Sequence, residues 1–196
     1  LTIQVEAVSL DPDNMLINGN FELGNAGWTS NGTVPAATIA DGVLTVSTDK
    51  TTSGDARTYA AMQLAPGTYQ LTFDVKGKPS QYRPYISVSK NYWSYDYGQY
   101  FLYDYNLSDD KWTTITEYFT VPESAADANT GLAPVYVTVW SSNTSYAPIT
   151  KMYFDDFELY KCFEVMVHNP DGKEATGLAE YTVPYAVDGQ SFEMKL

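Results

Sequence analysis

The sequence predicts an all-β protein, an antiparallel β-sandwich with a small extra β element formed by its two ends. Three observations lead to this fold class. Apolar residues alternate with polar ones in many short segments, as in half-buried strands. Turn sequences rich in Gly, Pro, Asn and Asp separate these segments, and no segment keeps a helical period over three turns. Many short strands between such turns are typical of sandwiches and barrels, and we expect a sandwich.

Length and composition limit the possible functions. The 196 residues fit one main domain that buries a core without disulfides, and Cys162, the only cysteine, rules out a disulfide framework and a Cys-based metal site. The net charge of -13, without any Lys/Arg cluster, argues against binding nucleic acid or anionic membranes. No segment is apolar for long enough to span a membrane, and the start at Leu1 suggests a processed chain. The 17 tyrosines favour a surface that binds a neutral or weakly charged ligand.

The first strand is expected within residues 1–8, which alternate between apolar and polar side chains. An economical arrangement pairs it with residues 162–172 and the rest of the C-terminal tail, so that the main module is an insertion between the two pieces. We therefore assign 14–161 to the sandwich, and 1–13 and 162–196 to accessory strands. Alternatively, this remainder, which is too small to fold alone, is part of a flanking domain.

The next strands are recognised by their parity, because alternate residues face opposite sides of a sheet. In residues 68–77 the apolar set faces the core: Tyr69, Leu71, Phe73 and Val75. The same rule, applied to residues 55–64, 83–90 and 135–142, leaves rings and small polar groups on the outer face of a sheet. These outward residues are Arg57, Tyr59, Ala61, Gln63, Tyr85, Ser87, Ser89, Tyr136, Thr138 and Trp140.

Residues 90–105 carry eight aromatic rings and are too long for one strand, which would extend about 50 Å at roughly 3.3 Å per residue. Asp96 and Gly98 provide turn chemistry, so we expect two arms joined at a tip. Phe101 and Leu102 then anchor the returning arm. The tip carries Tyr92, Trp93, Tyr95 and Tyr97 beside the outward face of Tyr85. A strand is expected in residues 111–121, and residues 122–131 have room for one helical turn.

Three segments resemble carbohydrate-binding modules of the group that includes families 4, 9, 16 and 22. They are NMLINGNFELGNAGW at residues 14–28, LAPGTYQLTFDVKG at 64–77 and MYFDDFELYK at 152–161. Their order and spacing match the opening motif, the Pro-Gly-x-Tyr strand and the closing strand with paired Asp. The resemblance implies a jelly-roll sandwich that binds carbohydrate.

Such modules typically contain a structural calcium near the opening motif and the closing strand. By this resemblance the best side-chain candidates are Glu22 and Asp156, with Asn20 and Asp155 as further oxygen donors. Ca²⁺ takes six to eight hard oxygen ligands of this kind. The alternative is that the two Asp residues cap a turn and Glu22 is a surface acid.

A sugar ring offers C–H groups to a flat aromatic ring and hydroxyls to amide, guanidinium or carboxylate groups. Trp28 and Trp112 are expected in the core, because one belongs to the Gly-Trp motif of the resemblance and the other opens a strand. The candidate ligand residues are Arg57, Tyr59, Gln63, Tyr85, Trp93, Tyr95, Tyr136 and Trp140.

The function expected is a non-catalytic module that holds a polysaccharide or oligosaccharide and targets a covalently linked enzyme or a cell-surface protein to it. Such a protein would be secreted or extracellular, with no membrane insertion. No motif marks a catalytic pair of carboxylates, and His168 is the only histidine, so hydrolysis and nucleophilic triads are not expected. The alternative function is a structural or adhesive β-sandwich that mediates protein contacts.

Overall fold

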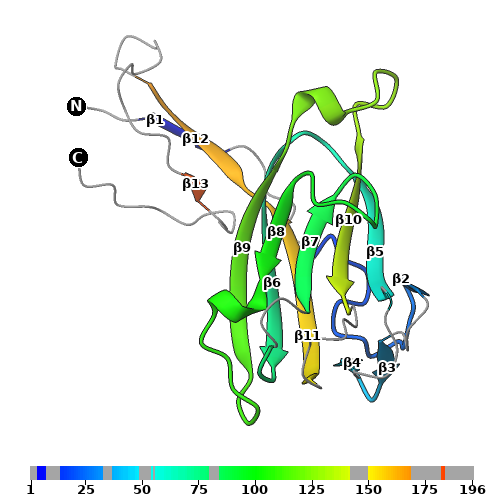
Figure 1. Cartoon of the computed structure of the whole chain (residues 1–196). Coiled ribbons are helices and arrows are strands. Elements are labelled where there is room, and N and C mark those ends of the chain that lie inside the picture. The colour runs from blue at the N-terminus through cyan, green and yellow to red at the C-terminus, as the bar shows by residue number, and fades with distance from the viewer. Residues whose placement is uncertain are drawn as a thin grey trace.

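The structure, a computed structural model, describes residues 4–7, 14–32, 37–48, 54, 56–79, 84–141, 150–168 and 182–183. Within these ranges the chain forms strands and two short 3-10 turns, η1 (Leu102–Asp104) and η2 (Glu123–Ala125), and no α-helix. The η2 turn is the helical turn predicted for residues 122–131. Two five-stranded antiparallel sheets pack face to face, which confirms the predicted sandwich (Figure 1).

The first sheet has the strand order β2-β5-β10-β7-β8, and each neighbouring pair is antiparallel. Its central strand β10 brings together segments far apart in the sequence. The strands of this sheet are β2 (Trp28–Gly32), β5 (Ala56–Leu64), β10 (Ala133–Trp140), β7 (Tyr85–Ser89) and β8 (Gly98–Phe101).

The second sheet has the order β3-β4-β11-β6-β9 and is also antiparallel throughout. Asp41 and Gly42 join its first two strands in a two-residue turn with positive φ at both positions, which suits the twist of a hairpin. The pairing of β11 with β6 is irregular between Asp155 and Glu158, where Asp156 has a φ of 47°. The strands are β3 (Thr38–Ala40), β4 (Val43–Thr48), β11 (Thr150–Lys161), β6 (Gly67–Lys76) and β9 (Thr113–Val121).

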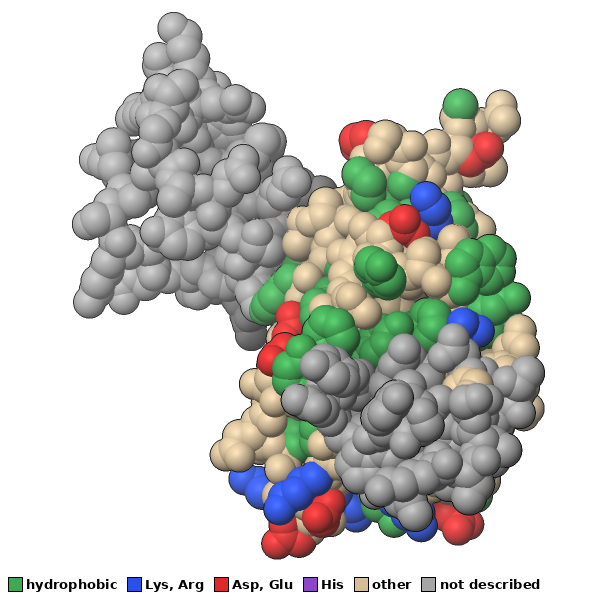
Figure 2. Space-filling model, viewed as in Figure 1, with side chains coloured by type: hydrophobic (Ala, Val, Ile, Leu, Met, Phe, Trp, Pro, Cys, Tyr) green, Lys and Arg blue, Asp and Glu red, His purple; other side chains and the backbone are tan. Residues whose placement is uncertain are grey.

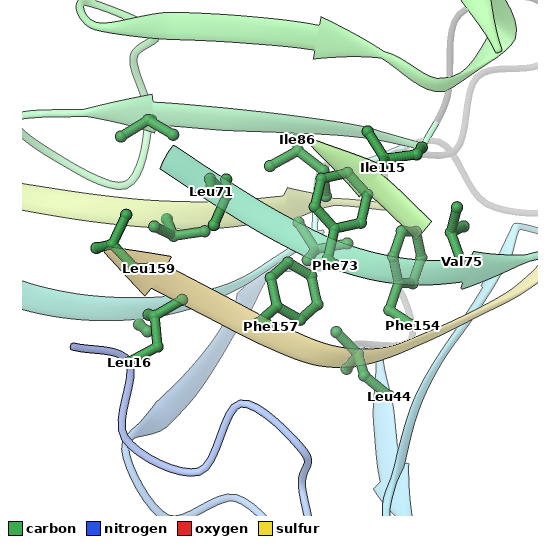
Figure 3. Close-up of a cluster of buried hydrophobic side chains, with 14 of the residues drawn as sticks. Leu16, Leu44, Leu71, Phe73, Val75, Ile86, Ile115, Phe154, Phe157 and Leu159 are labelled. Atoms are coloured by element: carbon green, nitrogen blue, oxygen red, sulfur yellow. The ribbon is translucent and has the colours of Figure 1, made fainter. Parts of the chain in front are cut away.

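The core lies between the two sheets and takes the side chains that the alternation predicts. The four inward residues of β6, Tyr69, Leu71, Phe73 and Val75, are all fully buried. Phe73 stacks on Phe157 with ring centroids 5.2 Å apart, and both rings lie among aliphatic side chains from both sheets (Figure 3). This core holds the two sheets in place and leaves each of them one outer face.

A third, three-stranded sheet has the order β1-β12-β13, with β1 (Gln4–Ala7), β12 (Phe163–His168) and β13 (Thr182–Val183). The first strand pairs with β12 from Gln4 opposite His168 to Ala7 opposite Val165. The pairing of the N-terminal strand with the segment after Cys162 is therefore as the sequence predicts. The division into a module of residues 14–161 and accessory strands stays a prediction. No helix in the described part of the chain is long and apolar enough to cross a membrane.

Candidate functional site

The outer face of the first sheet collects the strand residues that parity selected. Across the sheet, Trp140 of β10 lies opposite Arg57 of β5 on one side and Tyr85 of β7 on the other. Two residues earlier, Thr138 lies between Tyr59 and Ser87 in the same way. The alternation in these three strands therefore predicts which residues share a face, and β10 sets their order across it.

One end of this face is a closed group of side chains, the Trp140 cluster, made of Arg57, Tyr85, Phe101 and Trp140. The rings of Tyr85 and Trp140 stack with centroids 5.3 Å apart and an interplanar angle of 16°. The Arg57 guanidinium carbon lies 4.2 Å from the centroid of the Trp140 ring, a cation–π contact. The indole Nε1 donates a 2.7 Å hydrogen bond to Ser87 Oγ. Trp140 and Tyr85 are only 5% and 6% exposed, so both rings are packed rather than open to a ligand.

The other end carries the Tyr59 cluster, made of Tyr59, Tyr92, Trp93 and Tyr136. The rings of Tyr59 and Tyr92 stack at 4.8 Å with an angle of 7°, and Tyr136 tilts against Tyr59 at 5.6 Å. Trp93 meets the Tyr92 ring edge-on at 4.5 Å and is 58% exposed. Hydrophobic side chains gather over the same sheet in the space-filling view (Figure 2). The cluster is thus a continuous aromatic stack that ends in an accessible indole.

The phenol of Tyr59 stays protonated in this setting. Burial raises its pKa first, followed by the neighbouring hydroxyls of Tyr92 and Tyr136, while a hydrogen bond with Thr29 opposes the shift. A neutral phenol donates and accepts hydrogen bonds, which suits a hydroxyl-rich ligand.

Residues 90–97, between β7 and β8, present the exposed rings of this end. The ammonium of Lys90 lies 3.4 Å from a carboxylate oxygen of Asp96. The Asp96 carboxylate also accepts a hydrogen bond from the Ser94 hydroxyl, and this bond, followed by Lys90, lowers the pKa of Asp96. The backbone N–H of Tyr97 donates to Val88 O at 3.0 Å, and β8 begins at Gly98. The predicted break at Asp96 and Gly98 is confirmed, and the loop is tied to both arms.

The roles expected within the tyrosine-rich run need correction in two places. Tyr97 packs against the core and its hydroxyl points to Pro134 O, because the loop turns inward just before β8. The loop also lies beside Tyr59 and Tyr136 rather than beside Tyr85, which is at the other end of β7. Tyr95 is 59% exposed and makes no ring contact with another described residue. Leu102 is buried, as predicted for the returning arm.

The two tryptophans expected in the core differ. Trp28 is buried and its ring lies 5.0 Å from Phe21 and 5.2 Å from Phe157, which confirms the prediction. Trp112 is only half-buried and lies beneath the Lys76 ammonium, 4.8 Å from its ring centroid, so the prediction for Trp112 is wrong. It comes immediately before the first residue of β9 and therefore lies at the end of the second sheet.

Small polar side chains lie beside the aromatic clusters on this face. Ser87, Ser89 and Thr138 have no exposed surface. Thr138 Oγ1 is buried and has no hydrogen-bond partner, although buried hydroxyls nearly always have one. Gln63 lies exposed near the end of β5. Neither Tyr92 nor Thr138 is among the predicted site residues. The outward parity includes Thr138, but its missing partner cannot be seen in a sequence.

The described outward residues of β2, β5, β10, β7 and β8 include no carboxylate. They have aromatic, amide, hydroxyl or small side chains, and Arg57 is the one charged residue among them. Retaining and inverting glycoside hydrolysis both require a pair of carboxyl groups beside the bond that is cleaved. The described outward residues of these strands supply no such pair.

The calcium candidates gather near the β3–β4 turn and the irregular part of β11. A Cβ placed on Gly42 would lie 2.8 Å from Glu22 Oε1 and 3.6 Å from the carbonyl oxygen of Asn20. Burial raises the pKa of Asp155, and the charges of Asp156, Asp74 and Glu22 raise it further, against a backbone hydrogen bond from Asp156. Among the described residues, however, no three His, Cys, Asp or Glu side chains are close enough together to hold a metal ion.

Comparison with known proteins identifies a family of carbohydrate-binding domains. A family model described as a carbohydrate binding domain, CBM_4_9, matches residues 13–143, which is more than half of the chain. No curated protein sequence matches the chain significantly. Among solved structures, a CBM4 module covers 71% of this chain and 97% of its own length, with 18% identity and a TM-score of 0.50.

Two further solved structures are similar. TmCBM61 in complex with β-1,4-galactotriose covers 76% of this chain and 99% of its own, with 19% identity and a TM-score of 0.48. The family 29 module CBM29_1 from Piromyces equi covers 82% and 91%, with 13% identity and a TM-score of 0.40. At these identities the likeness concerns the fold alone. The family match shows that the chain belongs to this family of carbohydrate-binding domains and is a non-catalytic carbohydrate-binding module.

Proposed function

We propose that this module binds a neutral polysaccharide on the outer face of the first sheet, with the Tyr59 cluster as its main contact. The observation that carries this proposal is the aromatic stack that ends in the exposed indole of Trp93, 4.5 Å from Tyr92. Behind it, Tyr92 and Tyr59 are already stacked before any ligand arrives. A ring that is held in place loses less conformational entropy when a ligand binds.

The expected ligand is an uncharged glycan because the face offers rings and hydroxyls rather than paired charges. A pyranose can place its C–H groups against Trp93 and its hydroxyls toward the phenols and the Gln63 amide. Thr138 Oγ1 is a further group that lacks a hydrogen-bond partner. Its burial means that a ligand hydroxyl reaches it only after a small displacement of its neighbours. The Trp140 cluster then supports the sheet face and does not contact the sugar directly.

The role of such binding is to raise the local concentration of whatever is linked to the module at its glycan. We propose that the linked part is a secreted enzyme or a cell-surface protein, and that the module works outside the cell. The family match supports glycan binding rather than the alternative of an adhesive domain that binds protein.

Affinity electrophoresis across soluble glucan, xylan, mannan and galactan, followed by calorimetry on the best ligand, tests this proposal. Trp93→Ala should weaken binding by about 10-fold or more, since exposed aromatic anchors carry much of the energy of an interface. Tyr118→Ala is the matched control, because Tyr118 is also exposed, at 43%, but lies on the second sheet. If no glycan retards the wild-type protein, or if the two variants lose binding equally, the proposed site is wrong.

We also propose a structural calcium ion held by oxygens of Asn20, Glu22, Asp155 and Asp156, whose three carboxyl groups are too far apart in this structure to hold a metal ion and would draw together around it. Two observations support this proposal. Glu22 Oε1 and the Asn20 carbonyl oxygen both lie near Gly42, and neighbouring acidic charges add to the raised pKa of Asp155. Because these carboxylates repel one another, a cation among them would stabilise the fold.

A further inference from the structure

A second group of rings and charges lies on the opposite side of the sandwich, on the outer face of the second sheet. We call Lys76, Trp112, Lys151 and Tyr153 the Lys76 cluster. The Lys76 ammonium lies 4.8 Å from the centroid of the Trp112 ring and 4.9 Å from that of Tyr153. The Lys151 ammonium lies 5.1 Å from the Tyr153 ring. Two cations therefore flank one tyrosine, and one of them also reaches a tryptophan.

The strand register explains why these side chains meet. Tyr153 of β11 lies directly opposite Lys76 of β6, and Val75 lies opposite Thr113, so that Trp112 continues the same row. Lys151 is two residues before Tyr153 and therefore shares its face. Met152 is fully buried, which fixes the outward direction of its neighbours Lys151 and Tyr153.

Among the described residues, neither lysine of this cluster has a carboxylate partner. The ion pair found there joins Lys90 and Asp96. This matters in a chain whose formal net charge is -13. The nearest acid on β6, Asp74, accepts a 2.6 Å hydrogen bond from the Thr114 hydroxyl. In the loop before β9, Asp109 accepts one from the backbone N–H of Lys78. Asp155 lies opposite Asp74 in the next row of the same face, and it accepts a 2.8 Å hydrogen bond from the backbone N–H of Asp156. Among the described residues, neither carboxylate is paired with Lys76 or Lys151, so both ammonium groups are available to an external anion.

We propose that the Lys76 cluster is a second binding site, which takes a sugar unit that carries an anionic substituent, such as the carboxylate of a uronic acid. Trp112 and Tyr153 supply apolar surface for the C–H groups of the sugar, and the two ammonium groups supply charge-assisted hydrogen bonds to its anion. The formal net charge of -13 opposes the binding of an acidic glycan elsewhere, so we expect binding at this cluster. The proposal uses the fold and the charges of this face and does not depend on the neutral site across the sandwich.

Affinity electrophoresis with polygalacturonate, fully methyl-esterified polygalacturonate and dextran sulfate tests the proposal. The wild-type protein should be retarded by polygalacturonate and not by its ester, because esterification keeps the sugar backbone and removes the charge. Dextran sulfate shows whether a sulfate ester serves as well as a carboxylate. Retardation should weaken as NaCl rises to about 0.5 M, since salt screens exposed charges.

Two pairs of variants decide whether the binding is specific to this cluster. Lys151→Gln should lower the affinity for the acidic glycan about 5-fold, the upper range for an exposed charge pair, whereas Lys161→Gln on the same strand should leave it unchanged. Tyr153→Ala should weaken it similarly, and Trp93→Ala should leave it unchanged. The proposal is overturned if neither acidic glycan retards the protein, if Lys161→Gln weakens binding as much as Lys151→Gln, or if Tyr153→Ala has no effect. Thermal unfolding of each variant excludes loss of the fold as the cause.

Discussion

Replacing Tyr92 separates two interpretations of the aromatic stack on the first sheet. The Tyr92 ring covers one face of Tyr59, at 4.8 Å, and supports Trp93 from the side, at 4.5 Å. If Tyr92 holds Trp93 in position for the ligand, removing its ring should weaken binding. If Tyr92 instead occupies the place of a sugar on Tyr59, removing its ring should strengthen binding.

We expect the first result, because the loop that carries Tyr92 is fixed at both of its arms. Ring pairs of this kind contribute about 0.5–1.5 kcal/mol each beyond the area that they bury. Tyr92→Ala removes its contacts with Tyr59 and Trp93, and not all of their energy is lost from binding. A net loss of about 1–2 kcal/mol corresponds to roughly 5-fold to 30-fold weaker binding.

Calorimetry with the best neutral glycan measures this change, and Tyr92→Phe is the matched control. Phenylalanine keeps both ring contacts and loses only the hydroxyl, so its affinity should stay within about 2-fold of the wild type. Tighter binding by Tyr92→Ala would refute the supporting role and favour occlusion. Equal losses in the two variants would show that the hydroxyl, and not the ring, is what matters.

Three further predictions concern stability. Gly19→Ala should destabilise the fold by more than about 3 kcal/mol, since its Cβ would lie 1.9 Å from the Phe157 carbonyl oxygen. Gly24→Ala, with a φ of +62° and no atom within 4 Å, should cost only about 1 kcal/mol in urea unfolding. Ser87→Ala removes the hydrogen-bond acceptor of the Trp140 indole and should lower the free energy of unfolding by about 1–2 kcal/mol. Thr138→Val removes a buried hydroxyl that has no partner and should be neutral or stabilising. Urea unfolding compares the two variants. Since the pKa of Asp155 is raised in the fold, its contribution to stability is present at low pH and is lost as the pH rises through the raised pKa. Calcium should therefore raise the melting temperature more at neutral pH than in acid. Asp155→Asn should abolish this response, and an equal response in the variant would contradict the calcium site.

Strand parity could be predicted from the sequence because it is a local property of the chain. The alternation in residues 135–142 placed the valines in the core and Tyr136, Thr138 and Trp140 on the outer face, and the burial of Val135 and Val137 agrees. The spatial neighbours across β5, β10 and β7 could not be predicted, because the register depends on pairing between distant segments.

The burial of individual rings was less predictable than their direction. Tyr85 and Trp140 point outward as expected, yet they are covered and stack on each other. Trp93 and Tyr95 lie on a loop and remain exposed. Parity decides the side of a sheet, but loop conformation and neighbouring side chains decide how much of a ring is left for a ligand. For the same reason Trp112 is predicted as a core residue and is only half-buried.

The rings on the two outer faces of the sandwich have different neighbours although one core supports both. On the first sheet the rings adjoin hydroxyl groups and Arg57 rests on Trp140, whereas on the second sheet Lys76 and Lys151 adjoin the rings. Since outward residues contribute little to the core, a change of ligand charge requires only outward substitutions. On the two proposals taken together, the module holds a neutral chain on one side and an acidic one on the other. A variant that loses either binding activity should then keep both the fold and the other activity.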